Sequence, residues 1–382
     1  MWPLNSLFMH NVLGRSLTEA GTIMGLQSAC SLVGQFMSGF LSDRFGARKM
    51  LTLGLCTAIL DLTLIGSFPV WQVYAPGIIL FGFAVAFVFV PLNALVASIW
   101  PEGGRRGFNY LYVANNAGVA VGTAIGGVVA LVSFRLVFLL NALTFTIYFL
   151  VIGIGVFQQA PRQQAKATQH TVKPRLTQDK GFPSLAALSA GIFFVWTAYN
   201  QWVTVLPIVM TQRGFALPSY SFLWTLNGIF IVTLQPVTAL IIRRWATTFQ
   251  SQFYWACVLM ASTYLILEAQ MPYASYVVAM LILTLGEMLI LPSVPAAAAY
   301  LASDGNEGAY QGIVGGAASG GRMLGPVLGG LVFDHAGSSM VWLMAFGAMA
   351  IGLTSFGLYD LFERRLRATS PSNAPTRRSE PQ

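Results

Sequence analysis

The sequence predicts an all-α integral membrane protein with twelve transmembrane helices arranged as two bundles of six. Of the 382 residues, 55% are hydrophobic and only 9% are charged, and the mean hydropathy is +0.66. Soluble domains are less apolar and more charged than this. Apolar runs of about 20 residues, the length that a helix needs to cross a bilayer, recur along the whole chain. One polar, cationic, Gln-rich stretch divides these runs into two sets of six.

The predicted helices follow these apolar runs in order. We expect them at 17–41, 50–69, 73–99, 107–132, 134–157, 182–208, 218–242, 250–267, 273–300, 309–333 and 338–361, after a first, shorter run at 1–13. The predicted domains are an N-terminal six-helix half at 1–157, a linker at 158–181, a C-terminal half at 182–361 and a tail at 362–382.

The first run is short for a membrane span. A helix over residues 1–13 would be about 20 Å long, roughly two-thirds of the hydrocarbon core. Its amino terminus would then carry a charge inside the membrane, which is costly. We therefore expect the first helix to be incomplete at its N-terminus, and an in-frame segment to precede Met1.

The positive charges predict the orientation of the helices. If the loop at Arg15 faces outward, 17 of the 21 Lys and Arg residues lie in the predicted inner segments. Such an excess marks the cytoplasmic side of a membrane protein. We therefore expect the linker and the C-terminus in the cytoplasm, and no role in binding nucleic acid despite the net charge of +8.

The sequence offers little for metal binding or for catalysis. Its cysteines and histidines are scattered singly, at Cys30, Cys56, Cys257, His10, His170 and His335. We expect no metal site, and we interpret the cysteines as packing residues. No H-E-x-x-H and no G-x-x-x-x-G-K-[ST] motif occurs, so the sequence predicts neither a metalloprotease nor an ATPase.

A charged stretch, "SGFLSDRFGARKM", lies between the predicted second and third helices at 38–50. We expect its glycines to allow a tight turn, and Asp43 to accept hydrogen bonds from a neighbouring helix N-terminus, so that the cytoplasmic ends are held together. The alternative is a solvated loop whose charges only set topology. The residues that form this predicted latch are Gly39, Asp43, Arg44, Gly46 and Arg48.

Two glycine patterns repeat between the halves. "GVAVGTAIGG" from Gly118 and "GRMLGPVLGG" from Gly321 both read G-x3-G-x3-GG. Glycines spaced by four share one helix face, where another backbone can approach closely. The predicted packing positions are Gly118, Gly122, Gly126, Gly321, Gly325, Pro326 and Gly329. Parallel repeats are one way in which secondary transporters are built.

Together these motifs resemble the major facilitator superfamily, and most of all its 12-helix drug:proton antiporters. The stretch at 39–48 is similar to the family signature G-x-L-[AS]-D-R-x-G-[RK]-[RK], with Ala47 in place of a base. The resemblance implies that this loop stabilises the outward-facing state, with Asp43 as the matching acid. It also implies the cytoplasmic membrane of a bacterium. In the antiporters the fifth helix carries G-P-x-x-G-G; here Thr123 replaces that proline, and Pro326 supplies one in the eleventh helix.

Three ionisable residues lie deep in predicted helices: Asp61, Glu287 and Arg322. Such residues are functional candidates, because an unpaired charge there costs at least about 2.5 kcal/mol. Glu287 is our main candidate for proton coupling, since one carboxyl can exchange a proton for a substrate. The alternative is a structural pair with Arg322. Asp61 is a weaker coupling candidate, because its helix is peripheral in the fold that the chain resembles.

Aromatic and amide side chains are concentrated in the predicted seventh helix. They suit flat, lipophilic molecules, including cationic ones, although Trp and Tyr also collect at membrane interfaces. The predicted substrate cavity combines Asn93, Trp196, Tyr199, Asn200, Gln201 and Arg322.

We therefore expect a monomeric secondary transporter that exports small lipophilic or cationic compounds in exchange for protons, by rocking of its two halves. The proton gradient is its energy source, and no cofactor is predicted. One alternative is transport of a polar metabolite such as a sugar or an organic acid. The other is a membrane sensor that does not transport.

Overall fold

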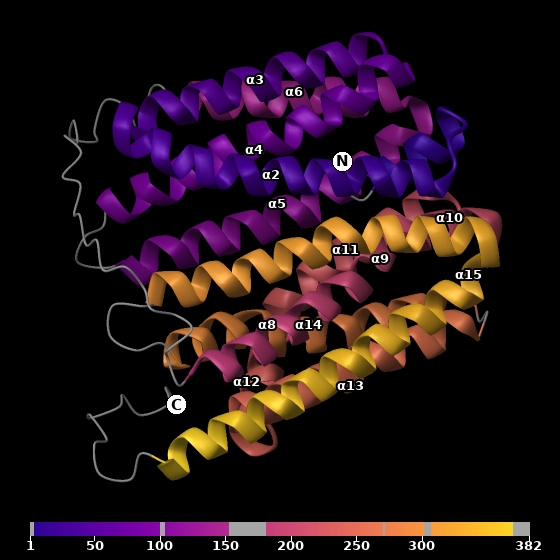
Figure 1. Cartoon of the computed structure of the whole chain (residues 1–382). Helices are drawn as coiled ribbons and strands as arrows, with labels where there is room; N and C mark the ends of the chain where they lie inside the picture. The colour runs from indigo at the N-terminus through magenta and orange to yellow at the C-terminus, as the bar shows by residue number, and fades with distance from the viewer. Residues whose placement is uncertain (1–3, 100–103, 153–180, 270–271, 302–306, 370–382) are drawn as a thin grey trace. The chain divides into compact units, whose positions relative to one another are not determined.

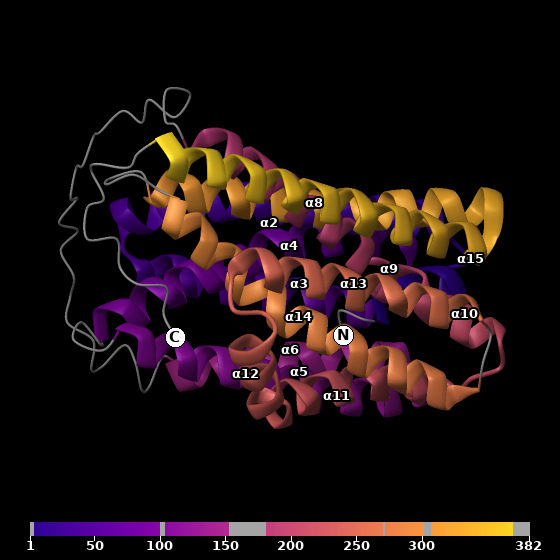
Figure 2. The ribbon, with the colours of Figure 1, turned by 90° about the horizontal axis from the view of Figure 1, so that it is seen from below.

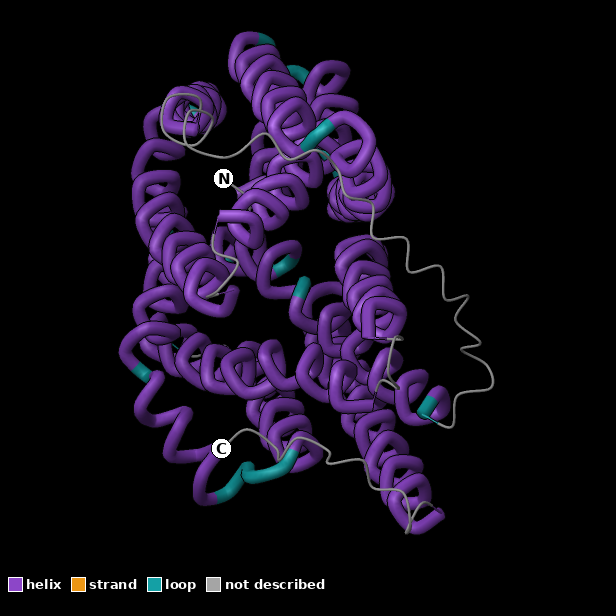
Figure 3. Tube along the Cα trace, turned by 90° about the vertical axis from the view of Figure 1, so that its left-hand side faces the viewer, coloured by secondary structure: helices purple, strands orange, loops and turns teal. Residues whose placement is uncertain are grey.

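The computed structural model describes residues 4–99, 104–152, 181–269, 272–301 and 307–369. In these residues every regular element is a helix (Figure 3), which confirms the predicted all-α fold. In chain order the elements are α1 (Asn5–Leu7), the π-helical turn η2 (Phe8–Val12), α2 (Leu17–Phe45), α3 (Ala47–Ser67), α4 (Trp71–Ile99), α5 (Gly104–Val132), α6 (Phe134–Val151), α8 (Phe182–Tyr199), α9 (Gln201–Thr204), α10 (Leu206–Gln212), α11 (Leu217–Thr233), α12 (Gln235–Arg244), α13 (Phe249–Glu268), α14 (Tyr273–Leu301) and α15 (Glu307–Thr369).

Within the described ranges, seven stretches are long and apolar enough to cross a membrane, and an eighth counts if α11 and α12 form one bent span. α2 and α13 have the length of a span, but small and polar residues lower their hydropathy. α15 contains two predicted helices, which meet at Gly337, where φ is +79°. The predicted set of about twelve helices is thus recovered.

The charged stretch at 39–48 is helical rather than a loop, which corrects our expected helix end at residue 41. α2 continues through Asp43 and Arg44 to Phe45, and only Gly46 separates it from α3. Gly46 has φ +93°, and its N–H donates to the carbonyl of Ser42 at 2.8 Å. The charges do not end α2 at residue 41, because a basic residue such as Arg44 is favoured in the last turn of a helix. For Asp43 the structure describes the backbone only.

Two of the predicted helices are broken. The predicted helix at 182–208 is divided into α8, α9 and α10, with breaks at Asn200 and at Val205. The predicted helix at 218–242 is divided into α11 and α12, which meet at 60°. Pro207 and Pro236 lie in the first turns that follow these breaks. Proline has no N–H to donate, so it begins a helical segment more readily than it continues one.

The described helices form two compact units. Unit 1 comprises 1–170 together with 201–228 and 323–337, and unit 2 comprises 171–200, 229–322 and 338–382. Unit 1 therefore contains segments of both predicted halves. The division into two six-helix halves stays a prediction, and the linker at 158–181 lies outside the described residues except for Gly181.

In unit 1, α2, α3, α4 and α6 lie side by side (Figure 1). Glycines bring these helices together: a Cβ added at Gly54 of α3 would lie 2.7 Å from the carbonyl carbon of Phe87 in α4, and Gly34 of α2 faces Phe83. The N-terminal turns are part of this unit, because the ring of Phe8 lies 4.9 Å from that of Tyr74. This packing is the close approach that small residues allow in membranes.

In unit 2, α13 and α14 pack along each other (Figure 2). A Cβ at Gly286 of α14 would lie 2.6 Å from Cγ of Met260 in α13. Phe253 of α13 stacks on Phe356 of α15 with ring centroids 4.6 Å apart, and Gly191 of α8 faces the same Phe356 ring. α8, α13, α14 and the last part of α15 therefore share one packed interior.

Candidate functional site

The structure brings Trp196 and Arg322 into contact inside unit 2. The guanidinium carbon of Arg322 lies 4.7 Å from the ring centroid of Trp196, and its Nη2 donates a hydrogen bond to Oγ of Ser319 at 2.7 Å. Gly321 allows this approach, because a side chain there would collide with the carbonyl of Phe193. A cation over an indole face contributes up to about 2 kcal/mol where water is excluded.

Two further predicted cavity residues lie next to Trp196. The Tyr199 ring meets the Trp196 ring edge-on, with centroids 5.1 Å apart and an angle of 70° between the planes. The side-chain amide of Asn200 donates to the carbonyl of Trp196 at 2.7 Å. Tyr199 and Asn200 are buried, whereas Trp196 and Arg322 are partly exposed. These four residues form what we call the Trp196 cluster.

Gln201 and Asn93 are not part of this cluster. Gln201 belongs to unit 1, is fully buried, and donates from Nε2 to the carbonyl of Gly325 at 2.8 Å. It also fills the space above Gly329. Its amide thus holds α9 against α15 rather than facing a substrate. Asn93 lies in α4, and its side chain is outside the described residues.

Glu287 lies half-buried near the middle of α14, in the same unit as the Trp196 cluster. Its neighbour Gly286 marks the face of α14 that packs on α13. Leu291, four residues further along the same helix face, is also half-buried, whereas Met288, Leu289 and Ile290 are buried. Glu287 therefore keeps partial access to its surroundings, beside three buried residues of the same helix.

Asp61 is more enclosed than Glu287. It is 5% exposed, in the contact between α3 and α4 of unit 1. A Cβ at Gly77 would lie 2.8 Å from its Oδ1, and Tyr74, one turn earlier on α4, is fully buried. Oδ2 of Asp61 has no hydrogen-bond partner among the described residues. A carboxylate without a partner in such an enclosed place is costly.

The two glycine repeats have different surroundings. In α15, Gly321 and Gly329 lie against other segments, and the carbonyl of Pro326 fills the space beside Gly21 of α2. In α5, an added Cβ at Gly118 or Gly122 would meet no described atom within 4 Å. Gly126 of α5 has one such neighbour, Cδ1 of Leu4 at 3.7 Å.

The close contact of α5 uses another face, which the spacing of four did not indicate. Gly127 lies directly against Ser221 of α11, and a Cβ at Gly228 of α11 would be 2.8 Å from that of Ala120. Thr123, which stands where the antiporters have a proline, shares a hydrogen bond of 3.3 Å with Thr225. Each glycine repeat ends in a GG pair, and the second glycine of that pair was the signal in the sequence for this other helix face.

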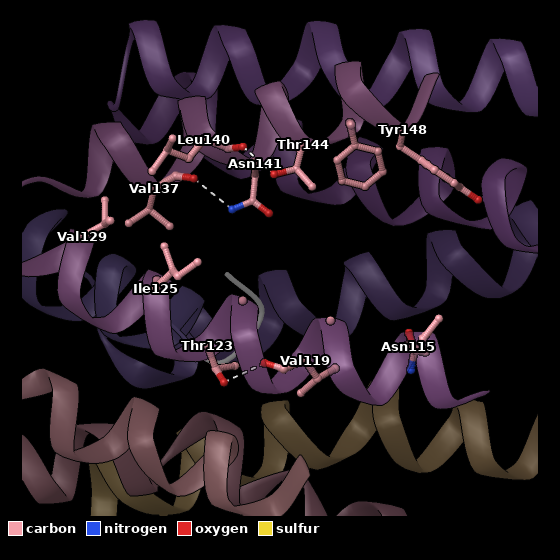
Figure 4. A pocket seen from close by; sticks show the side chains of 15 residues that line it. Asn115, Val119, Thr123, Ile125, Val129, Val137, Leu140, Asn141, Thr144 and Tyr148 are labelled. Carbon is pink, nitrogen blue, oxygen red and sulfur yellow. Dashed lines mark hydrogen bonds between the residues drawn. The ribbon is translucent and has the colours of Figure 1, made fainter. Parts of the chain in front are cut away.

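The open glycine face of α5 lines a cavity of about 590 Å³ that is shared with α6 (Figure 4). Its wall is mainly apolar. Asn141 turns its amide to the carbonyl of Val137 at 2.9 Å, and Thr123 donates to the carbonyl of Val119 at 2.7 Å. Because most of the lining is apolar and these two side chains already bond to backbone carbonyls of their own helices, the cavity suits apolar groups better than ions.

The two faces of α5 lead to a prediction for alanine substitutions. We expect Gly122→Ala to leave stability unchanged or raise it by up to about 1 kcal/mol, because alanine favours the helix and nothing described obstructs its Cβ. Gly127→Ala should lower stability by about 1–3 kcal/mol, because its Cβ collides with Ser221. The midpoint of thermal unfolding in one detergent measures both. An equal loss for both variants would show that the Gly122 face is also packed.

The structure so far defines a helical membrane protein with ionisable groups inside its helices, a combination that membrane transporters often have. The model of the Major Facilitator Superfamily matches residues 1–305. The chain is 38% identical to the uncharacterized MFS-type transporter YttB of Bacillus subtilis (strain 168), over 98% of this chain and 93% of YttB. The chain therefore belongs to the major facilitator superfamily and is a transporter rather than an enzyme.

More distant relatives have more specific names. The chain is 25% identical to the class D tetracycline resistance protein of Salmonella ordonez, over 88% of this chain and 84% of that protein. It is 22% identical to the multidrug resistance protein MdtH of Shigella dysenteriae serotype 1 (strain Sd197), over 90% and 86%. A crystal structure of a POT family transporter in complex with 5-aminolevulinic acid matches the fold with a TM-score of 0.81 at 14% identity, over 94% of this chain and 92% of that one.

Proposed function

We propose that this transporter exports small lipophilic compounds across a bacterial cytoplasmic membrane in exchange for protons. The Trp196 cluster is the observation that carries the proposal. It places two aromatic rings, an amide and a guanidinium together within unit 2, and aromatic rings bind flat apolar molecules by stacking. The names of the tetracycline and multidrug resistance relatives support the same substrate class.

The occupied face of Trp196 narrows the substrate class. A permanently cationic substrate would compete with the Arg322 guanidinium for this face and would be repelled by its charge. A neutral or zwitterionic lipophilic compound meets neither obstacle. We therefore propose that such compounds are preferred over organic cations. An anionic metabolite is the second candidate, because Arg322 places a positive charge beside the rings.

Glu287 is the proposed coupling residue, and Asp61 is the second candidate. A carboxyl in the membrane interior is most stable when it carries a proton, and it releases that proton when water or a charged partner reaches it. Glu287 has the partial exposure that such exchange needs, whereas Asp61 is enclosed between α3 and α4. No cofactor is needed, because the proton gradient supplies the energy. We propose a monomer with a cytoplasmic C-terminus.

The cytoplasmic end of α2 and the start of α3 are proposed to close the inner side of the transporter. Gly39, Asp43, Arg44, Gly46 and Arg48 lie at the end of α2 and the start of α3. We propose that Asp43 holds the cytoplasmic ends closed while the transporter faces outward. The turn at Gly46 keeps Arg48 at the start of α3, directly after the last charged turn of α2.

Export from everted membrane vesicles tests the proposal. Vesicles that contain the protein are energised, and uptake is followed for matched pairs of neutral and cationic fluorescent compounds of similar size. We expect uptake that a protonophore abolishes, with the neutral member of each pair favoured. Equal uptake with and without the protein would contradict transport of this substrate class. Uptake that ignores the protonophore would contradict proton coupling.

A further inference from the structure

Within unit 1, α2 packs along residues 323–334 of α15, which belong to the other predicted half. The carbonyl of Pro326 fills the space beside Gly21, and the carbonyl of Leu17 fills the space beside Gly330. A Cβ added at Gly25 would lie 2.7 Å from the carbonyl oxygen of Met323. These helices meet backbone to backbone, as small residues permit. By the predicted topology, this contact lies at the outer ends of both helices.

Asp334 closes the outermost end of this contact. Its Oδ1 accepts a hydrogen bond from the N–H of Leu17 at 3.2 Å, and its Oδ2 accepts one from the N–H of Thr18 at 2.6 Å. Leu17 and Thr18 are the first two residues of α2, whose N–H groups have no acceptor within the helix. The carboxylate also lies at the positive end of the α2 dipole.

The N-terminus of α2 has a second set of caps that makes the role of Asp334 distinct. Oγ of Ser16 accepts from the N–H of Glu19 at 3.1 Å, and Oε2 of Glu19 accepts from the N–H of Ser16 at 3.0 Å. This capping box keeps α2 intact by local contacts alone. Asp334 therefore satisfies the two amides that the box leaves open, and the box still caps α2 when Asp334 leaves them.

The other ionisable groups near the contact have partners within their own part of the chain. Arg15 pairs with Glu19 at 3.3 Å, and its guanidinium lies over the Trp71 ring at 4.6 Å from the centroid. Nδ1 of His10 lies 2.8 Å from the carbonyl oxygen of Arg15. These groups all belong to the N-terminal predicted half. Asp334 is therefore the charged group that reaches α2 from the C-terminal predicted half.

We propose that Asp334 is an outer latch: it holds the outer ends of α2 and α15 together when the outer side is closed, and it releases Leu17 and Thr18 when that side opens. This inference rests on the proposed alternating access. The latch uses the chemistry that the sequence led us to expect of Asp43 at the inner end, a carboxylate on the N-terminus of a neighbouring helix. The transporter would then have one such contact for each closed side.

A cysteine reporter tests the latch without substrate or a proton gradient. In a chain whose native cysteines are replaced, Ser6→Cys places a thiol at a fully buried position, where the native Oγ donates to the carbonyl of Val203 at 3.0 Å. This is a separate contact between the predicted halves. A membrane-impermeant maleimide reaches this thiol only when the outer side opens, so its rate of modification reports that opening. We expect Asp334→Asn to speed labelling about tenfold, since a charged hydrogen-bond partner is lost.

Two matched controls isolate the hydrogen bonds. Glu268→Gln makes the same charge change at an exposed outer helix end and should leave labelling unchanged. Leu17→Pro and Leu17→Ala lose the same side chain, but only proline removes the N–H, and proline fits the first position of a helix. We expect faster labelling with Leu17→Pro than with Leu17→Ala. The latch is overturned if Asp334→Asn matches Glu268→Gln, or if the two Leu17 variants behave alike.

These outcomes are separable from those of the proposed function. If export fails in vesicles but Asp334→Asn still speeds labelling, the latch stands and the substrate class is wrong. If export is proton-coupled and labelling is unchanged, transport stands and the latch is wrong.

Two further checks concern folding and the carboxylate itself. Monodisperse elution in detergent is required of every variant, and Asp334→Glu, which keeps the carboxylate, should restore slow labelling. Fast labelling with Asp334→Glu would count against the latch.

Discussion

Glu287→Gln is expected to abolish proton-driven export while the protein stays folded in the membrane. Glutamine keeps the shape of the protonated acid but has no proton to release, so each cycle loses its coupling. Everted vesicles measure the effect as loss of protonophore-sensitive uptake of a neutral dye. Exchange of substrate for substrate, which needs no net proton movement, should persist. Glu268→Gln, the same change at the exposed end of α13, is the control and should transport normally.

Unchanged coupling in Glu287→Gln would remove Glu287 from the proposed mechanism and make Asp61 the next position to test. A structural role has a different signature. If Glu287 only pairs with Arg322, the double replacement by glutamine should fold better than either single one, because each single change leaves a buried charge without its partner. Thermal midpoints of the three variants distinguish a coupling carboxyl from a structural ion pair.

Trp196→Ala is expected to raise the substrate concentration for half-maximal export by about tenfold or more. The change removes the ring that contacts both Arg322 and Tyr199, and with it the stacking surface, which contributes about 0.5–1.5 kcal/mol beyond the buried apolar area. Trp196→Phe keeps an aromatic face and should cost less. Concentration dependence of export in vesicles gives both values.

A control tryptophan separates binding from anchoring at the membrane surface. Trp245 follows the last turn of α12 and is exposed, as expected of an interfacial aromatic residue. Trp245→Ala should leave the half-maximal concentration unchanged. If Trp196→Ala and Trp245→Ala both lower only the amount of inserted protein, the Trp196 cluster serves topology, and the proposed substrate site is wrong.

Local signals in the sequence predicted the helices well, except where tertiary contacts determine the backbone conformation. The start of α2 was placed correctly at Leu17, where the apolar run begins, and the structure adds local caps from Ser16 and Glu19. The end of α2 was placed four residues early, since charge was taken as a sign of a loop. The breaks before Pro207 and Pro236 were missed because helix breaks at proline depend on how neighbouring segments pack.

The candidate site could be predicted in part only. Trp196, Tyr199 and Asn200 were grouped because they lie within one turn and a half of helix. Arg322 was included in the predicted cavity, but its contact with Trp196 joins positions 126 residues apart along the chain, and no period in the sequence encodes that contact. Gln201 is adjacent to the group in the chain and yet bonds to Gly325, beyond the break between α8 and α9 at Asn200. Asp334 was not singled out, since its partners are backbone amides and carry no side-chain signature.

The central claim is that substrate export and proton entry are two sides of one exchange, and reciprocal coupling measures it most directly. Purified protein is reconstituted in proteoliposomes that hold a pH-sensitive dye, with no imposed pH gradient, and a gradient of a neutral lipophilic substrate is applied. In an antiporter the two flows are linked, so substrate that moves down its gradient must drive protons across the membrane in the opposite direction. The account predicts a substrate-dependent pH change that is absent in Glu287→Gln. Substrate flux with no pH change in the unmodified protein would contradict it.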